Sequence, residues 1–322
     1  MGFMPAASPQ SSAHAYDAVL LIAYGGPNAM AEVRPFLANA LRGQPVPPER
    51  IEAVVQHYKQ IGGRSPLTDL TFRQARALEA ELCAGSNRLP VYVGMRNWTP
   101  YLHEALTRMA AEGVRRAIGV VMTVQQTEAS WDRYLRAVAA ARAEVGPAAP
   151  ELDYADEWHA HTLFIEAVAD RVRAALAEIR AERRAAATLV FTAHSVPAAM
   201  AAVSPYAAQV VEAAGLVAGR LGHRNWLVAY QSRSGNPRDP WLEPDVCEVL
   251  RQLGRTHVRD VVVAPIGFVC DHVEVLYDLD IAARSVAEQA GLGFIRAATV
   301  GDHPAFIRML ADVVRQRMQH PT

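Results

Sequence analysis

Residues 188–197 read TLVFTAHSVP, a short and mostly apolar run that ends at His194 and is followed by a proline-containing loop. Such a run is typical of a strand that is buried on both faces of a parallel sheet. Long segments with helical periodicity separate it from other runs of the same kind. These runs are Ala18–Ile22, Val91–Met95, Ala117–Met122, Trp226–Ala229, Val261–Pro265 and Gly293–Arg296. The alternation predicts an α/β fold made of two Rossmann-like halves, each a parallel sheet flanked by helices.

The clearest break in this pattern is the segment Gly146–Pro150, which is rich in Gly and Pro. It suggests an N-terminal domain over residues 1–148 and a C-terminal domain over residues 149–322, with the next strand, Glu151–Tyr154, in the second domain. The chain has 322 residues, of which 51% are hydrophobic and 20% charged, so it is long enough for two globular domains.

Charge and cysteine content exclude several classes of function. The formal net charge of -1 provides no basic excess for binding nucleic acid. Cys83, Cys247 and Cys270 are too few for a four-thiolate zinc or iron–sulfur site, and they suit a reducing cytoplasm. Residues 1–14 lack the basic and then apolar pattern of a secretory signal. We therefore expect a cytoplasmic protein, with peripheral membrane contact left open.

Ligands of open α/β sheets bind beyond the carboxyl ends of the strands, so the residues that follow each run are candidates. Tyr24 follows the first run, in AYGGP (23–27), where a phenol could face a ligand; the dinucleotide pattern G-x-G-x-x-G is absent there. Arg64 and Ser65 could hold a carboxylate, but Ser65 before a proline also fits a helix cap. His194 could take up a proton or bind a metal, or serve a structural purpose.

A row of acidic residues follows the strand that ends near Pro265. Asp271, Glu274 and Asp278 stand at i, i+3 and i+7, which places them on one face of a helix. Their charges repel unless a cation or protons lie among them, so the row indicates a cation or proton path. Hard oxygen ligands beside one histidine suit a transient Fe2+ better than structural zinc. The alternative is that Asp271 and Glu274 form a variant capping box.

Taken in order, these segments resemble the ferrochelatases, which insert Fe2+ into a porphyrin, over about Asp17 to Arg315. The most specific matches are FTAHSVP (191–197), YQSRSGNPRDPWLEP (230–244) and PIGFVCDHVEVLYDLDI (265–281). Supporting matches are AYGGP (23–27), YKQIGGRSPL (58–67) and VYVGMRNWTP (91–100). The resemblance implies a chelatase-like pair of domains with the porphyrin in a cleft between them. It also implies that the last helix, at about 303–319, packs back toward the first domain.

The resemblance also implies a role for individual residues. His194 would take pyrrole protons or contact the metal, and Glu274 would be its partner at the substrate Fe2+. Asp278 would relay metal or protons, and Tyr24 would be an axial ligand of the product iron. The residues implied to bind the porphyrin are Tyr24, Arg64, Ser65, Arg96, Tyr230 and Trp241.

The family has two branches, which use coproporphyrin III or protoporphyrin IX. Tyr24, the segment HYKQIGGRSPL (57–67) and the loop 230–244 resemble the coproporphyrin branch, whereas LYDLDI (276–281) is close to the other. The resemblance therefore favours an enzyme of haem biosynthesis that makes coprohaem. The alternatives are a protoporphyrin IX ferrochelatase that makes protohaem, a chelatase for another tetrapyrrole, and a non-catalytic haem or porphyrin carrier.

We expect Fe2+ and a porphyrin as substrates, no tightly bound cofactor and no iron–sulfur cluster; the next enzyme of the haem pathway stays open as a partner. The chain departs from the family's usual residues at Asn97, Gln125–Gln126, Glu243 and Ala282. The first two departures fall where the porphyrin is expected. Ala282 replaces a glutamate and so argues against a peripheral Mg2+ site.

Overall fold

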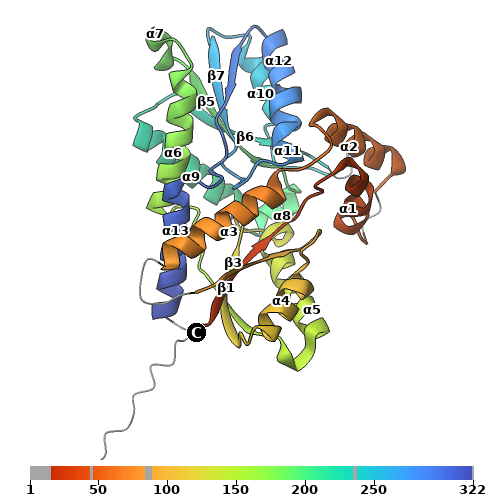
Figure 1. Cartoon of the computed structure of the whole chain (residues 1–322). Helices are drawn as coiled ribbons and strands as arrows, with labels where there is room; N and C mark the ends of the chain where they lie inside the picture. The colour runs from red at the N-terminus through yellow and green to blue at the C-terminus, as the bar shows by residue number, and fades with distance from the viewer. Residues whose placement is uncertain (1–15, 44–45, 84–88, 235–237, 321–322) are drawn as a thin grey trace, which may run out of the picture.

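The computed structural model describes residues 16–43, 46–83, 89–234 and 238–320 (Figure 1). Residues 1–14 and 235–237, which entered the sequence arguments, lie outside these ranges. The first sheet has the order β2-β1-β3-β4 and the second β6-β5-β7-β8, and all strands in both are parallel. The strands are β1 (Ala18–Ala23), β2 (Val91–Met95), β3 (Arg116–Val121), β4 (Glu151–Tyr154), β5 (Thr188–His194), β6 (Trp226–Gln231), β7 (Asp260–Ala264) and β8 (Gly293–Arg296).

Helices connect the strands and cover both faces of each sheet. The α-helices are α1 (Val33–Ala40), α2 (Pro48–Gln60), α3 (Leu67–Cys83), α4 (Leu102–Ala111), α5 (Arg133–Val145), α6 (Thr162–Ala177), α7 (Ala181–Arg184), α8 (Ala198–Ala202), α9 (Tyr206–Leu221), α10 (Val246–Leu253), α11 (Val273–Leu276), α12 (Arg284–Gln289) and α13 (Pro304–Gln319). Two π-helical segments, η2 (Glu128–Asp132) and η4 (Asp278–Ala283), and two 3-10 turns, η1 (Met30–Glu32) and η3 (Gly146–Ala148), complete the fold. The predicted α/β architecture is confirmed.

The burial of β1 explains why its sequence is apolar throughout. Every residue of the strand is buried, and alternate residues enter different hydrophobic clusters: Val19, Leu21 and Ala23 join one, and Ala18, Leu20 and Ile22 join another. The first of these clusters also contains Leu189, Phe191 and Ala193 of β5. One hydrophobic core is therefore shared by the two sheets, which fixes their central strands relative to each other.

The strand β4 lies in the first sheet, not in the second half where the sequence pattern put it. Its residues pair in parallel with β3, with Tyr154 opposite Gly119. The Gly-Pro segment before it is the end of a helix, because Gly146 follows α5 with a φ of 78° and begins η3. The first sheet therefore extends past residue 148 to Tyr154, and the break marks a local turn before its edge strand.

The C-terminal helix α13 lies against elements of both halves. It packs on α6, which precedes β5, and on α3 and β3 of the first half. Figure 1 shows it in dark blue, reaching from below α6 to the level of α3. No helix within the described residues is long and apolar enough to cross a bilayer.

Candidate active site

The site lies where the carboxyl ends of β1 and β5, the central strands of the two sheets, come together. Tyr24 directly follows β1, and its ring packs edge-on against Phe36 with centroids 6.3 Å apart. His194 is the last residue of β5. Desolvation raises the pKa of Tyr24, and the Glu274 carboxylate raises it further while the Arg96 guanidinium lowers it. The charge of the second half therefore acts on a side chain of the first, as expected for two strand ends that share one site.

His194 and Glu274 form an ion pair at the centre of the site. The distance from His194 Nε2 to Glu274 Oε1 is 3.4 Å, and the side chains are 27% and 37% exposed. The other ring nitrogen, Nδ1, contacts the carbonyl oxygen of Ser195. Burial opposes a charged imidazole, but the Glu274 carboxylate outweighs it and raises the pKa of His194 to about 9. The same pairing holds the pKa of Glu274 low against its burial, so the proton resides on the histidine.

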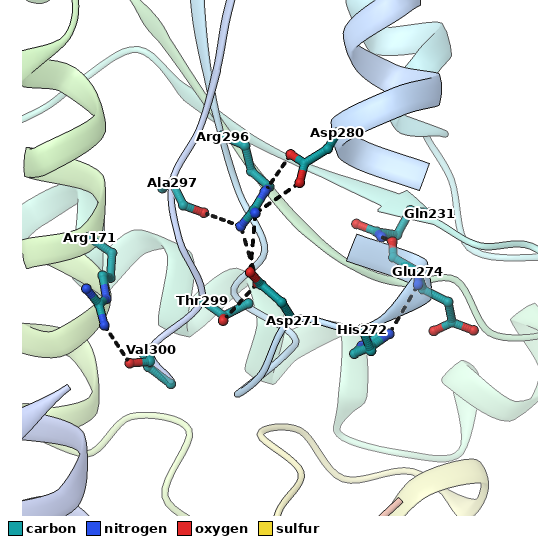
Figure 2. Close-up of polar contacts among 10 residues, drawn as sticks. All are labelled: Arg171, Gln231, Asp271, His272, Glu274, Asp280, Arg296, Ala297, Thr299 and Val300. Atoms are coloured by element: carbon teal, nitrogen blue, oxygen red, sulfur yellow. Dashed lines mark hydrogen bonds and ion pairs between the residues drawn. The ribbon is translucent and has the colours of Figure 1, made fainter. Parts of the chain in front are cut away.

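The backbone around Glu274 is held from two directions, which leaves its carboxylate free to face His194. His272 caps α11, and its Nδ1 accepts a hydrogen bond from the Glu274 amide at 3.2 Å. The side-chain amide of Gln231, at the end of β6, donates to the Glu274 carbonyl oxygen. The Glu274 carboxylate itself points away from these anchors (Figure 2).

Asp278 is the first residue of the π-helix η4 and lies within electrostatic range of Glu274. Its carboxylate accepts a hydrogen bond from the Ser232 hydroxyl. Burial raises the pKa of Asp278 to about 6, with a further contribution from Glu274, although the Ser232 hydrogen bond favours the ionised form. Asp278 can therefore exchange a proton close to neutral pH.

The expected row of three carboxylates is wrong at Asp271. Its oxygens accept from Thr299 Oγ1 at 3.0 Å and lie 3.3 Å from the Arg296 guanidinium, away from the Glu274 carboxylate (Figure 2). Asp271 lies before α11, which is a single turn. The i, i+3 spacing therefore does not put the Asp271 and Glu274 side chains on one helical face. The capping-box alternative is also wrong, because His272 is the cap.

No group of three or more His, Cys, Asp or Glu side chains is close enough to hold a metal ion in the part of the chain that the structure describes. The His194–Glu274 pair offers two side chains that could bind a metal, one from the end of β5 and one from α11. Two ligands suit a cation in transit better than a permanently bound one.

A sequence model of the ferrochelatase family matches residues 16–318. The chain belongs to the ferrochelatase family. Ferrochelatases are enzymes that insert iron into a porphyrin, so the predicted enzyme class and its two substrates are confirmed.

Curated relatives of this ferrochelatase family member are similar over most of its length. The coproporphyrin III ferrochelatase of Mycolicibacterium smegmatis is 42% identical over 306 residues, which cover 94% of this chain and 90% of that protein. The coproporphyrin III ferrochelatase of Nocardia farcinica is 43% identical over 312 residues, covering 94% and 89%. That of Mycobacterium tuberculosis is 43% identical over 302 residues, covering 93% and 85%.

Solved structures support the chelatase fold at low sequence identity. The sirohydrochlorin chelatase SirB of Bacillus subtilis subspecies spizizenii, in complex with cobalt, matches with a TM-score of 0.56 and 13% identity, covering 94% of this chain and 96% of that one. A protein of Deinococcus radiodurans with structural similarity to chelatases matches with a TM-score of 0.57 and 16% identity, covering 92% and 54%. These two likenesses concern the fold alone.

Arg64 and Arg96, the two basic residues expected to bind the porphyrin, differ in whether they already have an acidic partner. Arg64 forms an exposed ion pair with Asp69 at 2.8 Å. The guanidinium of Arg96 makes no hydrogen bond or ion pair within the described ranges, and its charge lowers the pKa of both Tyr24 and Tyr134. Arg96 is thus a half-buried cation beside Tyr24 that is free to meet an anionic group.

Ser65 has a structural partner that explains its place in the motif. Its side chain is buried, and its oxygen accepts from the Leu67 amide at 3.3 Å at the start of α3. A Cβ placed on Gly26 would lie 2.8 Å from Ser65 Cβ, so the two segments touch closely. The Ser65 hydroxyl thus holds the first amide of α3, as a helix-capping role requires, although the helix begins at Leu67 and not at Pro66; the contact of Ser65 with a porphyrin stays a prediction.

Tyr230 lies in β6, and Trp241 lies in the loop after it, which runs beside the segment that follows His194. Tyr230 is buried at the end of β6, and its amide donates to the Pro244 carbonyl oxygen at 2.8 Å. Trp241 pairs with Pro197 in an isolated antiparallel bridge, and Ser195 Oγ donates to the Leu242 carbonyl oxygen at 2.9 Å. The described part of the loop therefore supports the strand end that carries His194.

Asn97 Nδ2, Gln125 Nε2 and Trp241 Nε1 are buried N–H groups that find no hydrogen-bond partner among the residues that the structure describes. Asn97 and Gln125 are two of the positions where the chain departs from its family. Buried donors of this kind are costly unless a ligand or water satisfies them. The backbone of Asn97 pairs with that of Tyr24, and the backbone of Trp241 pairs with that of Pro197, so two of these residues lie next to the strand ends of the site.

Sequence reasoning missed Ser232, Gln231, Tyr206 and Arg296 as parts of the site. Gln231 ends β6 and Ser232 follows it, both within the motif 230–244, so their position at a strand end was a usable signal. Tyr206 Oη donates to the His194 carbonyl oxygen at 2.8 Å, a contact that no local pattern foretells. Arg296 ends the run Gly293–Arg296, and a basic residue at a strand end was a signal in the sequence for a contact with nearby carboxylates.

Proposed function

We propose that the chain inserts ferrous iron into coproporphyrin III and so forms coprohaem in haem biosynthesis. The observation that carries the proposal is the His194–Glu274 ion pair at the end of β5, which lies within electrostatic range of Tyr24 at the end of β1. Further support comes from relatives named coproporphyrin III ferrochelatases at 42–43% identity. In this proposal iron is a substrate, and the enzyme needs no tightly bound cofactor.

The net reaction exchanges one Fe2+ for the two N–H protons of the porphyrin, so the site must accept protons and release a cation. In the free enzyme Glu274 is ionised and His194 carries the proton. An incoming Fe2+ competes for the Glu274 charge that sustains the imidazolium. His194 then releases its proton, and the neutral imidazole becomes the acceptor for a pyrrole proton.

Asp278 continues this proton path toward solvent. Its pKa of about 6 lies between those of Glu274 and His194, and the Ser232 hydroxyl orients its carboxylate. A group that titrates near the working pH both accepts and releases protons readily. Each turnover delivers two protons by this route while the charge of the site returns to its starting value.

Coproporphyrin III carries four propionate groups and protoporphyrin IX two, so charge favours the former substrate where unpaired cations surround the site. Arg96 is such a cation. The charge of Arg50 acts on both Glu274 and Asp278, and that of Arg133 acts on Tyr24. Arg133 is already ion-paired with Glu128 at 3.2 Å, so the argument rests on Arg96: a cation beside Tyr24 suits a substrate with more than two carboxylates.

The decisive experiment is anaerobic Fe2+ insertion, followed by absorbance, with each porphyrin supplied separately. We expect a larger kcat/KM with coproporphyrin III. A preference for protoporphyrin IX would reverse the substrate assignment, and tight porphyrin binding without metallation would favour a carrier. His194→Ala should remove turnover with the fold intact, whereas the exposed control His257→Ala should retain it.

The same assay tests Tyr24 as an axial ligand of the product iron. Tyr24→Phe removes the phenol oxygen and keeps the ring that packs on Phe36. The spectrum of the bound iron product should change while porphyrin affinity stays close to that of the wild type. A product spectrum identical to the wild type would exclude the ligand role.

A further inference from the structure

Arg296, the last residue of β8, joins two carboxylates with one guanidinium. Its Nε and Nη2 donate to the two oxygens of Asp280 at 2.6 and 3.0 Å, which is a bidentate contact. Its Nη1 and Nη2 also lie 3.3 Å from the two oxygens of Asp271 (Figure 2). The Arg296 side chain is only 12% exposed, so these contacts are shielded from solvent.

The two carboxylates bracket the segment that carries the proposed catalytic residues. Asp271 is three residues before Glu274, and Asp280 is two residues after Asp278. Between them the backbone changes from the single turn α11 to the π-helix η4, where the Ala282 amide donates to the Tyr277 carbonyl oxygen at 2.9 Å. A single turn and a short π-helix have few hydrogen bonds of their own to fix their backbone. The contacts of Asp271 and Asp280 with Arg296 therefore limit how far the segment between them can shift.

Arg296 does not take part in the chemistry directly. Within the described part of the chain its side chain contacts Asp271, Asp280 and the Ala297 carbonyl oxygen, whereas the Glu274 carboxylate faces His194. Thr299 Oγ1 adds a second donor to Asp271 from the segment that follows β8. The end of β8 thus acts on Glu274 through the backbone that these carboxylates hold.

We propose that Arg296 is a positioning residue for iron insertion, which sets Glu274 opposite His194 by holding Asp271 and Asp280 at once. This inference rests on the proposed function. The same contacts place a positive charge between Asp271 and Asp280, so that Glu274 and Asp278 are the carboxylates left to serve the iron.

The test compares Arg296→Lys and Arg296→Met with the wild type. Lysine keeps the charge but has one terminal nitrogen, which cannot bridge two carboxylates in this geometry. We expect both variants to lower kcat by roughly tenfold to a hundredfold with KM for the porphyrin unchanged, because small misplacement of a reacting group costs about that much. Asp280→Asn and Asp271→Asn should lower kcat in the same way.

Arg284→Lys is the matched control, because Arg284 lies at the same junction but contacts backbone carbonyl oxygens and the Phe294 ring. It should leave kcat within about twofold of the wild type, in contrast to Arg296→Lys. Rates are expressed per folded molecule, with the folded fraction taken from circular dichroism. If Arg296→Lys merely lowers the melting temperature, or restores kcat relative to Arg296→Met, the positioning role is overturned.

The wild type run in parallel separates this inference from the function on which it rests. A wild type without turnover on any porphyrin overturns the proposed function and the Arg296 role with it. An active wild type with an equally active Arg296→Lys variant overturns the Arg296 role and leaves the function standing. An active wild type with a slow Arg296→Lys and an unaffected Arg284→Lys supports both.

Discussion

Asp278 is a site residue whose protonation should change the reaction rate between pH 5 and neutral pH. Burial raises its pKa to about 6, and the Ser232 hydrogen bond opposes that shift by stabilising the carboxylate. If ionised Asp278 relays protons, the rate of iron insertion rises with pH through about 6. Ser232→Ala removes the stabilising hydrogen bond, so the pKa of Asp278 rises and this limb of the pH–rate profile moves to higher pH.

The stability of the Ser232→Ala variant follows from the same linkage. Because the folded pKa of Asp278 is above its unfolded value, its contribution to stability is complete at low pH and is lost as pH rises through about 6. The variant should therefore lose more stability at pH 8 than at pH 5. Ser234→Ala, at an exposed position in the same loop, is the control and should move neither profile. Coincident pH–rate profiles for wild type and Ser232→Ala would remove Asp278 from the proton path.

At the scale of elements, the turn after β1 depends on glycine for two separate reasons. Gly25 has a φ of +86°, and a Cβ there would lie 2.9 Å from the Trp98 amide nitrogen. Gly113 has a similar φ of +83°, but a Cβ there meets nothing within 4 Å. The pair separates the backbone cost of a left-handed residue from the cost of a close approach.

We expect Gly113→Ala to cost about 1 kcal/mol of unfolding free energy, which is the left-handed penalty alone. Gly25→Ala should cost about 1–3 kcal/mol more, because the methyl group forces the turn away from Trp98 and disturbs the Tyr24 position. Urea unfolding of both variants measures the difference. Equal losses would mean that the close approach at Gly25 relaxes without cost.

Other elements of the site show how local pattern and position combine. The sequence indicated correctly that the Ser65 hydroxyl bonds an amide at the start of α3, because such a contact spans only two residues. The regular helix expected across Asp271–Asp278 was not realised, since α11 ends after one turn and η4 has π-type spacing. A helical period predicts a shared face only where the helix is continuous.

At the scale of the whole molecule, Gln74 of α3 ties the first half to the site segment of the second. Its side chain is fully buried, and its Nε2 donates to the Gly301 carbonyl oxygen at 2.8 Å and lies 3.4 Å from that of Val269. Val269 is two residues before Asp271, so this contact anchors the chain that leads into the acidic segment. It lies beside the core that both sheets share.

Gln74→Leu keeps the volume of the side chain but leaves these carbonyl groups without their donor. We expect a loss of about 1–3 kcal/mol in unfolding free energy, since buried polar groups without partners carry that cost. Gln252→Leu is the control, because Gln252 makes an exposed hydrogen bond to Glu248 within one helix. Urea unfolding compares the two, and equal stability would show that the contact between the halves is dispensable.

The sequence by itself determined the order of strands and helices, the α/β class, the enzyme family and the candidates His194, Glu274 and Tyr24. These depend on the chemistry of nearby residues: buried strands need apolar runs, and strand ends collect polar side chains. Asp278 was also singled out from the sequence, but its titration near neutral pH depends on burial that only the folded chain provides.

Only the tertiary structure decided which sheet β4 joins, that Asp271 pairs with Arg296, and that one core spans both sheets. Each of these depends on partners far apart in the chain, such as residues 271 and 296 or strands 116–121 and 151–154. Residue patterns report whether a segment is buried or exposed, but many partners satisfy the same pattern. The choice among them is made by how the helices and sheets pack, because that packing alone sets which side chains come within hydrogen-bonding distance.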